Sequence, residues 1–325
     1  MIISRTPVRI SFFGGLTDLK EFYSKSYGAV LSTAIRKYIY VAINKKFDDK
    51  IKVSHIETEV VDSLDGIKHP IMRECLRAKG ISNGIEISAI SDMPNYGIGL
   101  GSSSSLTVGT LNALGSYVGH KEVPEVLADE ACKIEIDTLK RQAGKQDPYI
   151  TAVGGFRYIK FYPDEKVSIE TVSMSDTTIK DLKDSLITFY IAGRRDGDEI
   201  IGDQKKNLLK NIKTLEEMRD QAEIGMNLLK KGDINSFGGL LDKAWKLKRS
   251  LSSKISTSAI DSYYSLGIKA GALGGKVGGA GGAGFLTFFC EKERQEKLKE
   301  SLSMLKAMDV AFEDGGTRIV YDDTH

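Results

Sequence analysis

The stretch from Met93 to Leu114 reads MPNYGIGLGSSSSLTVGTLNAL and joins a run of glycine and serine residues to a helical pattern. The first turn of a helix leaves about four backbone N–H groups unpaired and carries a partial positive charge. Glycines before the helix let the backbone approach a ligand closely, and serine hydroxyls add donors and an oxygen that suits Mg²⁺. These features predict an anion site, best suited to phosphate. Taken alone, the same residues also suit a loop with serine N-caps.

Two familiar nucleotide-binding patterns fail on this sequence. A P-loop ending at Lys276 would need a glycine at Ala270 and a serine or threonine at Val277. The G-x-G-x-x-G run from Gly279 to Gly284 precedes the strand-like residues FLTFF, whereas a dinucleotide-binding fingerprint opens a helix. A phosphate site here must therefore be of another type.

Three further segments stand out: TPVRISFFGGLTDL (6–19), GKQDPYITAVGG (144–155) and GGKVGGAGGAGFLTFF (274–289). Together with the Gly/Ser stretch they resemble the motifs of the GHMP kinase superfamily, in order and over essentially the whole chain. Within it, the chain resembles the sugar-1-kinase branch, most of all the heptose 7-phosphate kinases and then the fucokinase-like enzymes. The resemblance implies an α+β fold of two domains: a ribosomal protein S5 domain 2-like domain over residues 1–180 that binds ATP, and a ferredoxin-like domain over residues 181–325.

The resemblance also implies how ATP and Mg²⁺ are held. The expected phosphate-binding residues are Gly97, Gly99, Gly101, Ser102, Ser103 and Ser104. Ser104 or Ser103 is expected to bind Mg²⁺, with Glu135 as a second ligand and Glu130 as its alternative. A third-motif loop is expected to close over the nucleotide, and its residues are Gly279, Ala280, Gly281 and Gly282. Gly278 stands where the family often has a serine, so one expected hydroxyl is missing.

Asp147 is the predicted catalytic residue, because a carboxylate can orient a sugar hydroxyl and accept its proton during phosphoryl transfer. Its position matches an aspartate of galactokinase-like members. Arg9, in the first motif, is expected to lie close to Asp147 and to stabilise charge on the transferring group. Without the resemblance, Asp147 would be read as a turn residue before Pro148.

The expected sugar-binding residues are Asp18, Gly14 and Gly15, of which Asp18 matches an aspartate that binds sugar hydroxyls in galactokinase-like enzymes. Gly15 and Leu16 stand where galactokinases have a glutamate and a histidine, which favours a larger or phosphorylated sugar. Arg194 and Arg195 follow a predicted strand and are candidates for a substrate phosphate, because arginine makes bidentate contacts with phosphate.

The predicted reaction is therefore an ATP- and Mg²⁺-dependent phosphorylation of the anomeric hydroxyl of a sugar. The expected substrate is D-glycero-D-manno-heptose 7-phosphate, converted to the 1,7-bisphosphate in GDP-heptose biosynthesis. Two alternatives stay open: a kinase of an unphosphorylated sugar such as fucose, and a non-catalytic regulator of the same fold that binds ATP and sugar.

The elements that must position these residues can be read from the patterns of apolar residues. Helices are expected from 69 to 81, after the Gly/Ser stretch, from 123 to 139, from 202 to 254 with a break near Gly232, from 256 to 273 and from 293 to 308. Strands are expected over 5–13, 37–47, 51–63, 84–94, 154–163, 167–172, 185–193, the apolar end FLTFF of segment 274–289, and 317–322. Two α+β halves that meet near residue 180 fit this order.

Composition narrows the remaining possibilities. The chain has 325 residues and a formal net charge of +2, which argues against a nucleic-acid-binding protein. Cys75, Cys132 and Cys290 are far apart, so they support neither a disulfide framework nor a zinc site. The N-terminal residues lack the pattern of a signal peptide, and no apolar run has the length expected of a membrane-spanning helix. We expect a cytoplasmic enzyme, monomer or homodimer, whose partner is a small sugar phosphate.

Overall fold

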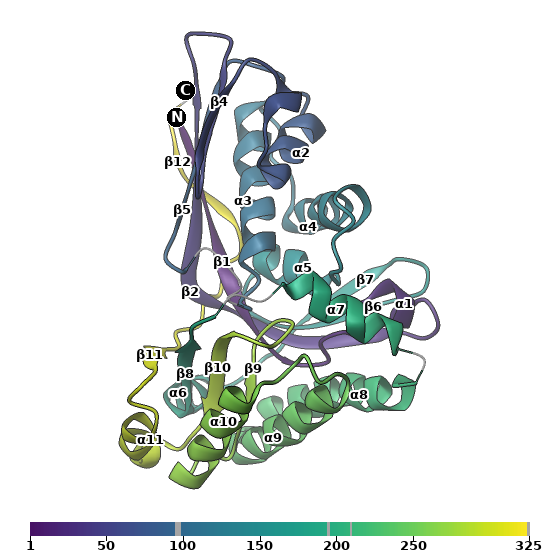
Figure 1. The fold of residues 1–325 in the computed structure, drawn as a ribbon, viewed down its shortest axis with the longest axis vertical. Helices are drawn as coiled ribbons and strands as arrows, with labels where there is room; N and C mark the ends of the chain where they lie inside the picture. Colours follow the sequence, from purple (N-terminus) through teal and green to yellow (C-terminus); the bar gives the residue numbers. More distant parts are fainter. Residues whose placement is uncertain (95–98, 194–195, 209, 324–325) are drawn as a thin grey trace.

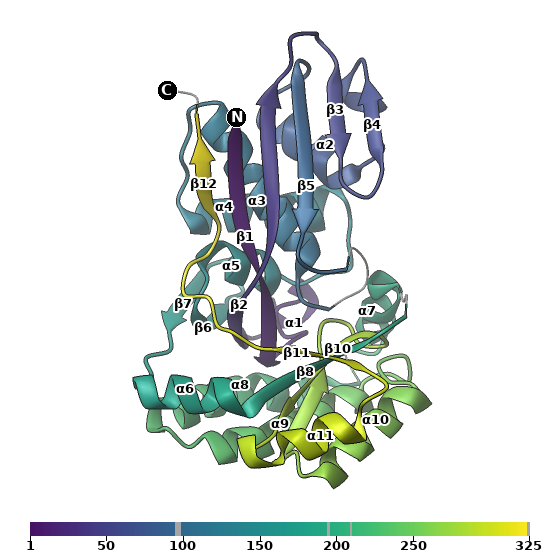
Figure 2. The same ribbon diagram turned by 90° about the vertical axis from the view of Figure 1, so that its left-hand side faces the viewer.

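The computed structural model describes residues 1–94, 99–193, 196–208 and 210–323. It contains a large and a small β-sheet, each covered by helices. The two layers follow one another along the long axis of the molecule (Figures 1 and 2). The α+β fold expected from the sequence is confirmed. No helix in these described ranges is long and apolar enough to cross a membrane.

The large sheet has the strand order β12-β1-β2-β5-β3-β4, with β6 beside β2 and β7 beside β6. Its strands are β1 (Ile2–Phe13), β2 (Gly28–Lys45), β3 (Ile51–Ser54), β4 (Thr58–Val61), β5 (Ile85–Ser91), β6 (Phe156–Phe161), β7 (Val167–Thr171) and β12 (Arg318–Asp322). All neighbours are antiparallel except β3 and β5. The long strand β2 organises the sheet, because its first part pairs with β6, its last part with β5 and most of its length with β1.

Helices cover one face of the large sheet (Figure 1). They are α2 (Pro70–Ala78), α3 (Ser102–Tyr117), α4 (Pro124–Cys132) and α5 (Gln146–Val153), with the short α1 (Lys20–Tyr23) at the lower end. A single apolar cluster between these helices and the sheet includes Val41, Ile87, Leu111 and Ile150, all essentially buried. This core fixes where α3 and α5 begin, and both helices begin at the candidate site.

The small sheet has the order β11-β8-β10-β9 and is antiparallel throughout. Its strands are β8 (Leu186–Ile191), β9 (Gly274–Val277), β10 (Gly284–Phe289) and β11 (Lys306–Asp309). The helices of this half are α6 (Asp176–Ser185), α7 (Gly197–Lys206), α8 (Ile212–Lys231), α9 (Ile234–Ser250), α10 (Ser258–Ala270) and α11 (Gln295–Ser301). Gly232 ends α8 in the left-handed conformation, which confirms the predicted break.

The two halves meet where aromatic side chains of β1 pack on the helices of the second half. The ring of Phe237 on α9 makes edge contacts with Phe12 and Phe13, at centroid distances of 5.2 and 5.1 Å. Gly225 of α8 lies against Phe13 so closely that a Cβ there would come to 2.6 Å from its ring. The first motif thus joins the two layers as well as contributing to the site.

Three helix predictions need correction. The helical region predicted from 202 to 254 has a second break besides the one at Gly232, because α7 ends at Lys206 and α8 begins at Ile212. The helix predicted from 293 to 308 ends at Ser301, and Lys306–Asp309 form strand β11 instead. Pairing of β11 with the edge of β8 outweighs the local helical pattern. The helix predicted from 123 to 139 is α-helical only to Cys132, and Lys133–Thr138 form a π-helical turn. Such turns often occur at functional sites, and this one carries Glu135.

The division near residue 180 stays a prediction. The structure adds one fact to it, since β12, near the end of the chain, pairs with β1 in the large sheet. Cys75, Cys132 and Cys290 are free and buried.

Candidate active site

The N-terminus of α3 opens into a cavity between the two halves. Gly101 precedes the helix with φ 74°, a conformation that favours glycine, and no side chain caps the first turn. The first backbone N–H groups of α3 are therefore available to a ligand. Ser102, Ser103 and Ser104 line the cavity.

The four consecutive serines have different roles. Ser104 Oγ donates to Glu135 Oε2 at 3.1 Å, and Ser103 Oγ accepts from the guanidinium of Arg141. Ser105 is fully buried, and its hydroxyl donates to the carbonyl of Pro7 at 2.8 Å. Ser105 therefore fastens α3 to β1, while its neighbours face the cavity.

Arg9 and Asp147 form a two-pronged ion pair at the floor of the cavity. Nε and Nη2 of Arg9 donate to Oδ1 and Oδ2 of Asp147, both at 2.6 Å, and Nη1 donates to the carbonyl of Gly99 at 2.7 Å. The side chain of Arg9 is 4% exposed and that of Asp147 is 25% exposed. Arg9 thus fixes the orientation of the carboxylate, which stays partly exposed to the cavity. The prediction that these two residues lie close together is confirmed.

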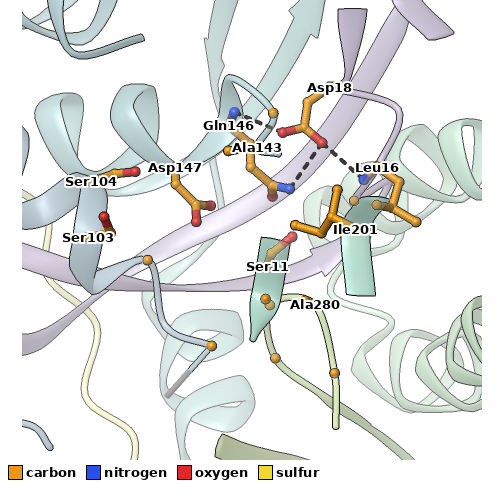
Figure 3. Close-up of a pocket in the computed structure, with 18 of the residues that line it drawn as sticks. Ser11, Leu16, Asp18, Ser103, Ser104, Ala143, Gln146, Asp147, Ile201 and Ala280 are labelled. Atoms are coloured by element: carbon orange, nitrogen blue, oxygen red, sulfur yellow. Dashed lines mark hydrogen bonds between the residues drawn. The ribbon is translucent and has the colours of Figure 1, made fainter. Parts of the chain in front are cut away.

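A second polar group, centred on Asp18, lies close to Asp147 in the same cavity. Asp18 accepts hydrogen bonds from the backbone N–H of Leu16 at 3.0 Å and of Gln146 at 3.0 Å, and from Nε2 of Gln146 at 3.2 Å. Burial raises the pKa of Asp18 to about 6. Figure 3 shows Asp18, Gln146, Ser11 and Asp147 around the same pocket.

Two buried polar atoms in this group have no hydrogen-bond partner among the described residues: Ser11 Oγ and Gln146 Oε1. Both side chains line the cavity, on either side of Gly15, whose Cβ position would be 3.5 Å from Gln146 Nε2 and 3.9 Å from Ser11 Oγ. Buried polar atoms normally have a partner. A ligand that carries hydroxyl groups would supply one.

The third-motif loop, between β9 and β10, forms the side of the cavity that faces the small sheet. Gly279, Ala280 and Gly281 line it. Gly99 of the second motif lies directly against Gly278, so that a Cβ on Gly99 would come to 2.6 Å from the Gly278 carbonyl oxygen. The two glycine-rich loops, distant in the sequence, therefore form one wall.

Comparison with known proteins agrees with this geometry. The GHMP kinases N terminal domain matches residues 67–155, and the GHMP kinases C terminal domain matches residues 226–305. The chain belongs to the GHMP kinase family. It is therefore an enzyme that transfers phosphate from ATP.

Several relatives align along nearly the whole GHMP kinase chain. D-glycero-alpha-D-manno-heptose 7-phosphate kinase of Campylobacter jejuni is 27% identical over 319 residues, which cover 93% of each chain. The crystal structure of a D-glycero-D-manno-heptose 1-phosphate kinase from Bacteroides thetaiotaomicron superposes with a TM-score of 0.83 at 22% identity, covering 99% of this chain and 100% of that one. The bifunctional fucokinase/GDP-fucose pyrophosphorylase of Arabidopsis thaliana is 23% identical over 334 residues, and the match covers 94% of this chain and 31% of that protein.

The pocket of this GHMP kinase fits a divalent cation beside Glu135. Glu135 is buried, its Oε1 has no hydrogen-bond partner among the described residues, and burial raises the pKa of its carboxyl to about 7. A cation would offset that burial, and Mg²⁺ needs only one or two protein oxygens besides phosphates and water. The described residues contain no cluster of three or more metal-binding side chains. Glu130, the alternative ligand, pairs instead with Lys79 at 2.6 Å and does not line the cavity.

The other predicted site residues divide into three groups. Gly15 lines the cavity, whereas Gly14 does not: its Cβ position would lie 1.9 Å from the Ala29 carbonyl oxygen, so it serves the close approach of β1 and β2. Gly282 also lies outside the lining, and its N–H donates to the Ile255 carbonyl at 2.8 Å. Gly97, Arg194 and Arg195 lie outside the described residues.

Several residues that line the cavity were not predicted from the sequence, among them Ser11, Arg141, Gln146, Lys248 and Lys276. One signal was available for Lys248. The buried residues Phe237, Leu241 and Ala244 recur at helical spacing along α9, and Lys248 falls on the same face. A lysine at a core position of an amphipathic helix indicates a functional charge.

Proposed function

We propose that this ATP-dependent sugar kinase phosphorylates the anomeric hydroxyl of D-glycero-D-manno-heptose 7-phosphate, giving the 1,7-bisphosphate used in GDP-heptose biosynthesis. The observation that carries the proposal is the carboxylate of Asp147, held by Arg9 and open to a pocket between the N-terminus of α3 and the group around Asp18.

In this proposal the phosphates of ATP lie against the first turn of α3, where backbone N–H groups and the hydroxyls of Ser103 and Ser104 are available. Mg²⁺ bound by Ser104 and Glu135 would neutralise phosphate charge. Asp147 orients the anomeric hydroxyl and accepts its proton as the oxygen bonds to the γ-phosphorus and the bond to the leaving ADP breaks. Arg9 stabilises negative charge on the transferring group.

The choice of a heptose phosphate rests on the relatives and on the polar character of the pocket. Two heptose phosphate kinases are among the relatives that align along nearly the full chain. Ser11 and Gln146 offer buried polar atoms to sugar hydroxyls, and Gly15 leaves room beside them. The fucokinase relative supports an unphosphorylated sugar as a second candidate.

The test is ADP release with ATP and Mg²⁺ across D-glycero-D-manno-heptose 7-phosphate, unphosphorylated heptose, fucose, galactose and mevalonate. Selective turnover of the heptose 7-phosphate, lost in Asp147→Asn, supports the proposal. Turnover of fucose or of unphosphorylated heptose would change the proposed substrate and leave the proposed reaction, phosphorylation of a sugar, in place. ATP binding without turnover of any sugar favours a non-catalytic regulator.

A further inference from the structure

Two lysines from the second half of the chain reach the floor of the cavity. Lys248 comes from α9 and Lys276 from β9, and their exposed fractions are 6% and 8%. Lysine is among the residues least often buried without a partner. Both side chains line the same cavity as Asp147, so an explanation for their burial has to be sought there.

Within the part of the chain that the structure describes, neither lysine has a carboxylate partner. Lys248 Nζ donates to the carbonyl of Val277 at 3.3 Å and to that of Gly279, and Lys276 Nζ donates to the carbonyl of Phe12 at 2.8 Å. Among the ion pairs of the described residues, none involves either lysine. An ammonium group has three donors, so each lysine keeps at least one for a ligand.

The charged groups close to the two lysines carry more positive than negative charge. Lys248 is influenced by Arg9 and Asp147, and Lys276 by Lys248 and Arg9. Asp147 is the single carboxylate in this set, and Arg9 already binds both of its oxygens. Burial lowers the pKa of Lys248 to about 7 and that of Lys276 well below its usual value. An anion bound beside the two lysines would offset the cost of burying their positive charges and would raise their pKa values.

We propose that Lys248 and Lys276, together with Arg9, form a binding site for a phosphoryl group beside Asp147 in the cavity. The phosphoryl group is either the one transferred from ATP or the phosphate of a phosphorylated sugar. This inference rests on the proposed kinase function. Since Lys248 also holds the carbonyl of Gly279, the same ammonium group links the charge of the ligand to the position of the third-motif loop.

The test compares Lys248→Met and Lys276→Met with Lys246→Met. Methionine keeps much of the length of lysine and removes its charge. Lys246 lies on the same helix with a side chain 67% exposed, and it pairs with Asp242 outside the cavity. The probes are ADP, the non-hydrolysable analogue AMPPNP, heptose 7-phosphate and unphosphorylated heptose, each titrated at equilibrium.

If the lysines hold the transferred phosphoryl group, both variants weaken AMPPNP roughly 10- to 100-fold and leave ADP unchanged. If they hold the substrate phosphate, both variants weaken heptose 7-phosphate and leave the unphosphorylated sugar unchanged. Equal weakening of all probes means that the lysines only brace the loop, and unchanged binding means that they bind nothing. Either of these two results overturns the proposal.

A measurement on the unmodified protein covers the case in which a variant does not fold. Binding of AMPPNP or heptose 7-phosphate at pH 8.5, where phosphates are fully ionised, is expected to take up protons onto the lysines. Calorimetry in two buffers of different ionisation enthalpy measures this uptake, and its absence with both ligands contradicts the proposal. If no sugar is phosphorylated and AMPPNP binding still depends on the lysines, the proposed function fails while this site stands.

Discussion

The backbones of Gly99 and Gly278 lie in direct contact in one wall of the cavity, although the two residues are 179 positions apart in the sequence. Gly99 has φ 69°, and a Cβ on it would come to 2.6 Å from the Gly278 carbonyl oxygen and 2.7 Å from its carbonyl carbon. No side chain fits between the two loops. The second and third glycine motifs therefore behave as one structural unit.

Gly99→Ala is expected to push the two loops apart and to lower kcat/KM roughly 10- to 100-fold, because small displacements at a phosphoryl-transfer site are costly. Gly119→Ala is the matched control. Gly119 also has a positive φ, at 79°, and its Cβ position has nothing within 4 Å. Steady-state kinetics of both variants measure the effect, and equal losses would mean that backbone strain alone is responsible.

Asp147→Asn is expected to lower kcat roughly 10²- to 10⁴-fold and to leave ATP affinity near its original value, because the side chain acts on the acceptor hydroxyl. Asp137→Asn, which changes an exposed carboxylate on the neighbouring π-helical turn, should behave like the unmodified enzyme. Rapid-quench kinetics and nucleotide titration separate the two quantities. Near-normal turnover of Asp147→Asn would remove this residue from the catalytic role.

Glu135→Gln is expected to raise the Mg²⁺ concentration for half-maximal activity about 10-fold or more, because it removes the charged ligand. Glu130→Gln is the matched control, since Glu130 is bound to Lys79 away from the cavity. Activity measured against Mg²⁺ at fixed ATP compares the two variants. A larger effect in Glu130→Gln would reverse the assignment.

The buried carboxyl of Asp18 is expected to make the stability of the ligand-free enzyme depend on pH. Its pKa rises from the usual 3.8 to about 6 in the folded protein, so the unfolded chain loses this proton first as pH increases. The free energy of unfolding therefore falls by roughly 3 kcal/mol from this group between about pH 4 and pH 6, and the loss persists above that range.

Denaturant titrations of the unmodified enzyme and of Asp18→Asn at several pH values isolate this contribution, because every other group titrates in both proteins. The unfolding free energy of the unmodified enzyme should fall relative to that of the variant across this window. Two curves that stay parallel would show that Asp18 titrates normally.

The sequence was sufficient to predict those site residues whose role depends on the type of residue and on its neighbours within a motif. The Gly/Ser run before α3 predicted the helix N-terminus in the cavity, and the motif resemblance paired Arg9 with Asp147. It could not decide between Ser103 and Ser104 as the Mg²⁺ ligand, because adjacent residues with the same hydroxyl differ only in which side of the helix they occupy. The π-helical turn carries Glu135, which lines the cavity, whereas Glu130 does not. The pattern of apolar residues does not predict this turn, so it could not decide between the two glutamates.

Other features depend on contacts between distant segments. The residues 306–309 continue a helical pattern and nevertheless form β11, because the edge of β8 offers hydrogen bonds there. Lys276 looked like a failed P-loop lysine in the sequence, and its place in the cavity follows from the pairing of β9 with β10. Gln146 is marked as a site residue by its hydrogen bonds to Asp18 and by a buried oxygen that has no partner among the described residues.

The pairing of β12 with β1 has a consequence for synthesis of the enzyme on the ribosome. Strand β1 ends at Phe13 and its partner β12 begins only at Arg318, so this edge of β1 stays open while the segment between the two strands is synthesised. An open edge is a template for pairing with other chains. Nascent chains and fragments that lack β12 are thus the species most exposed to aggregation, and a chaperone that covers β1 would protect them until the final strand arrives.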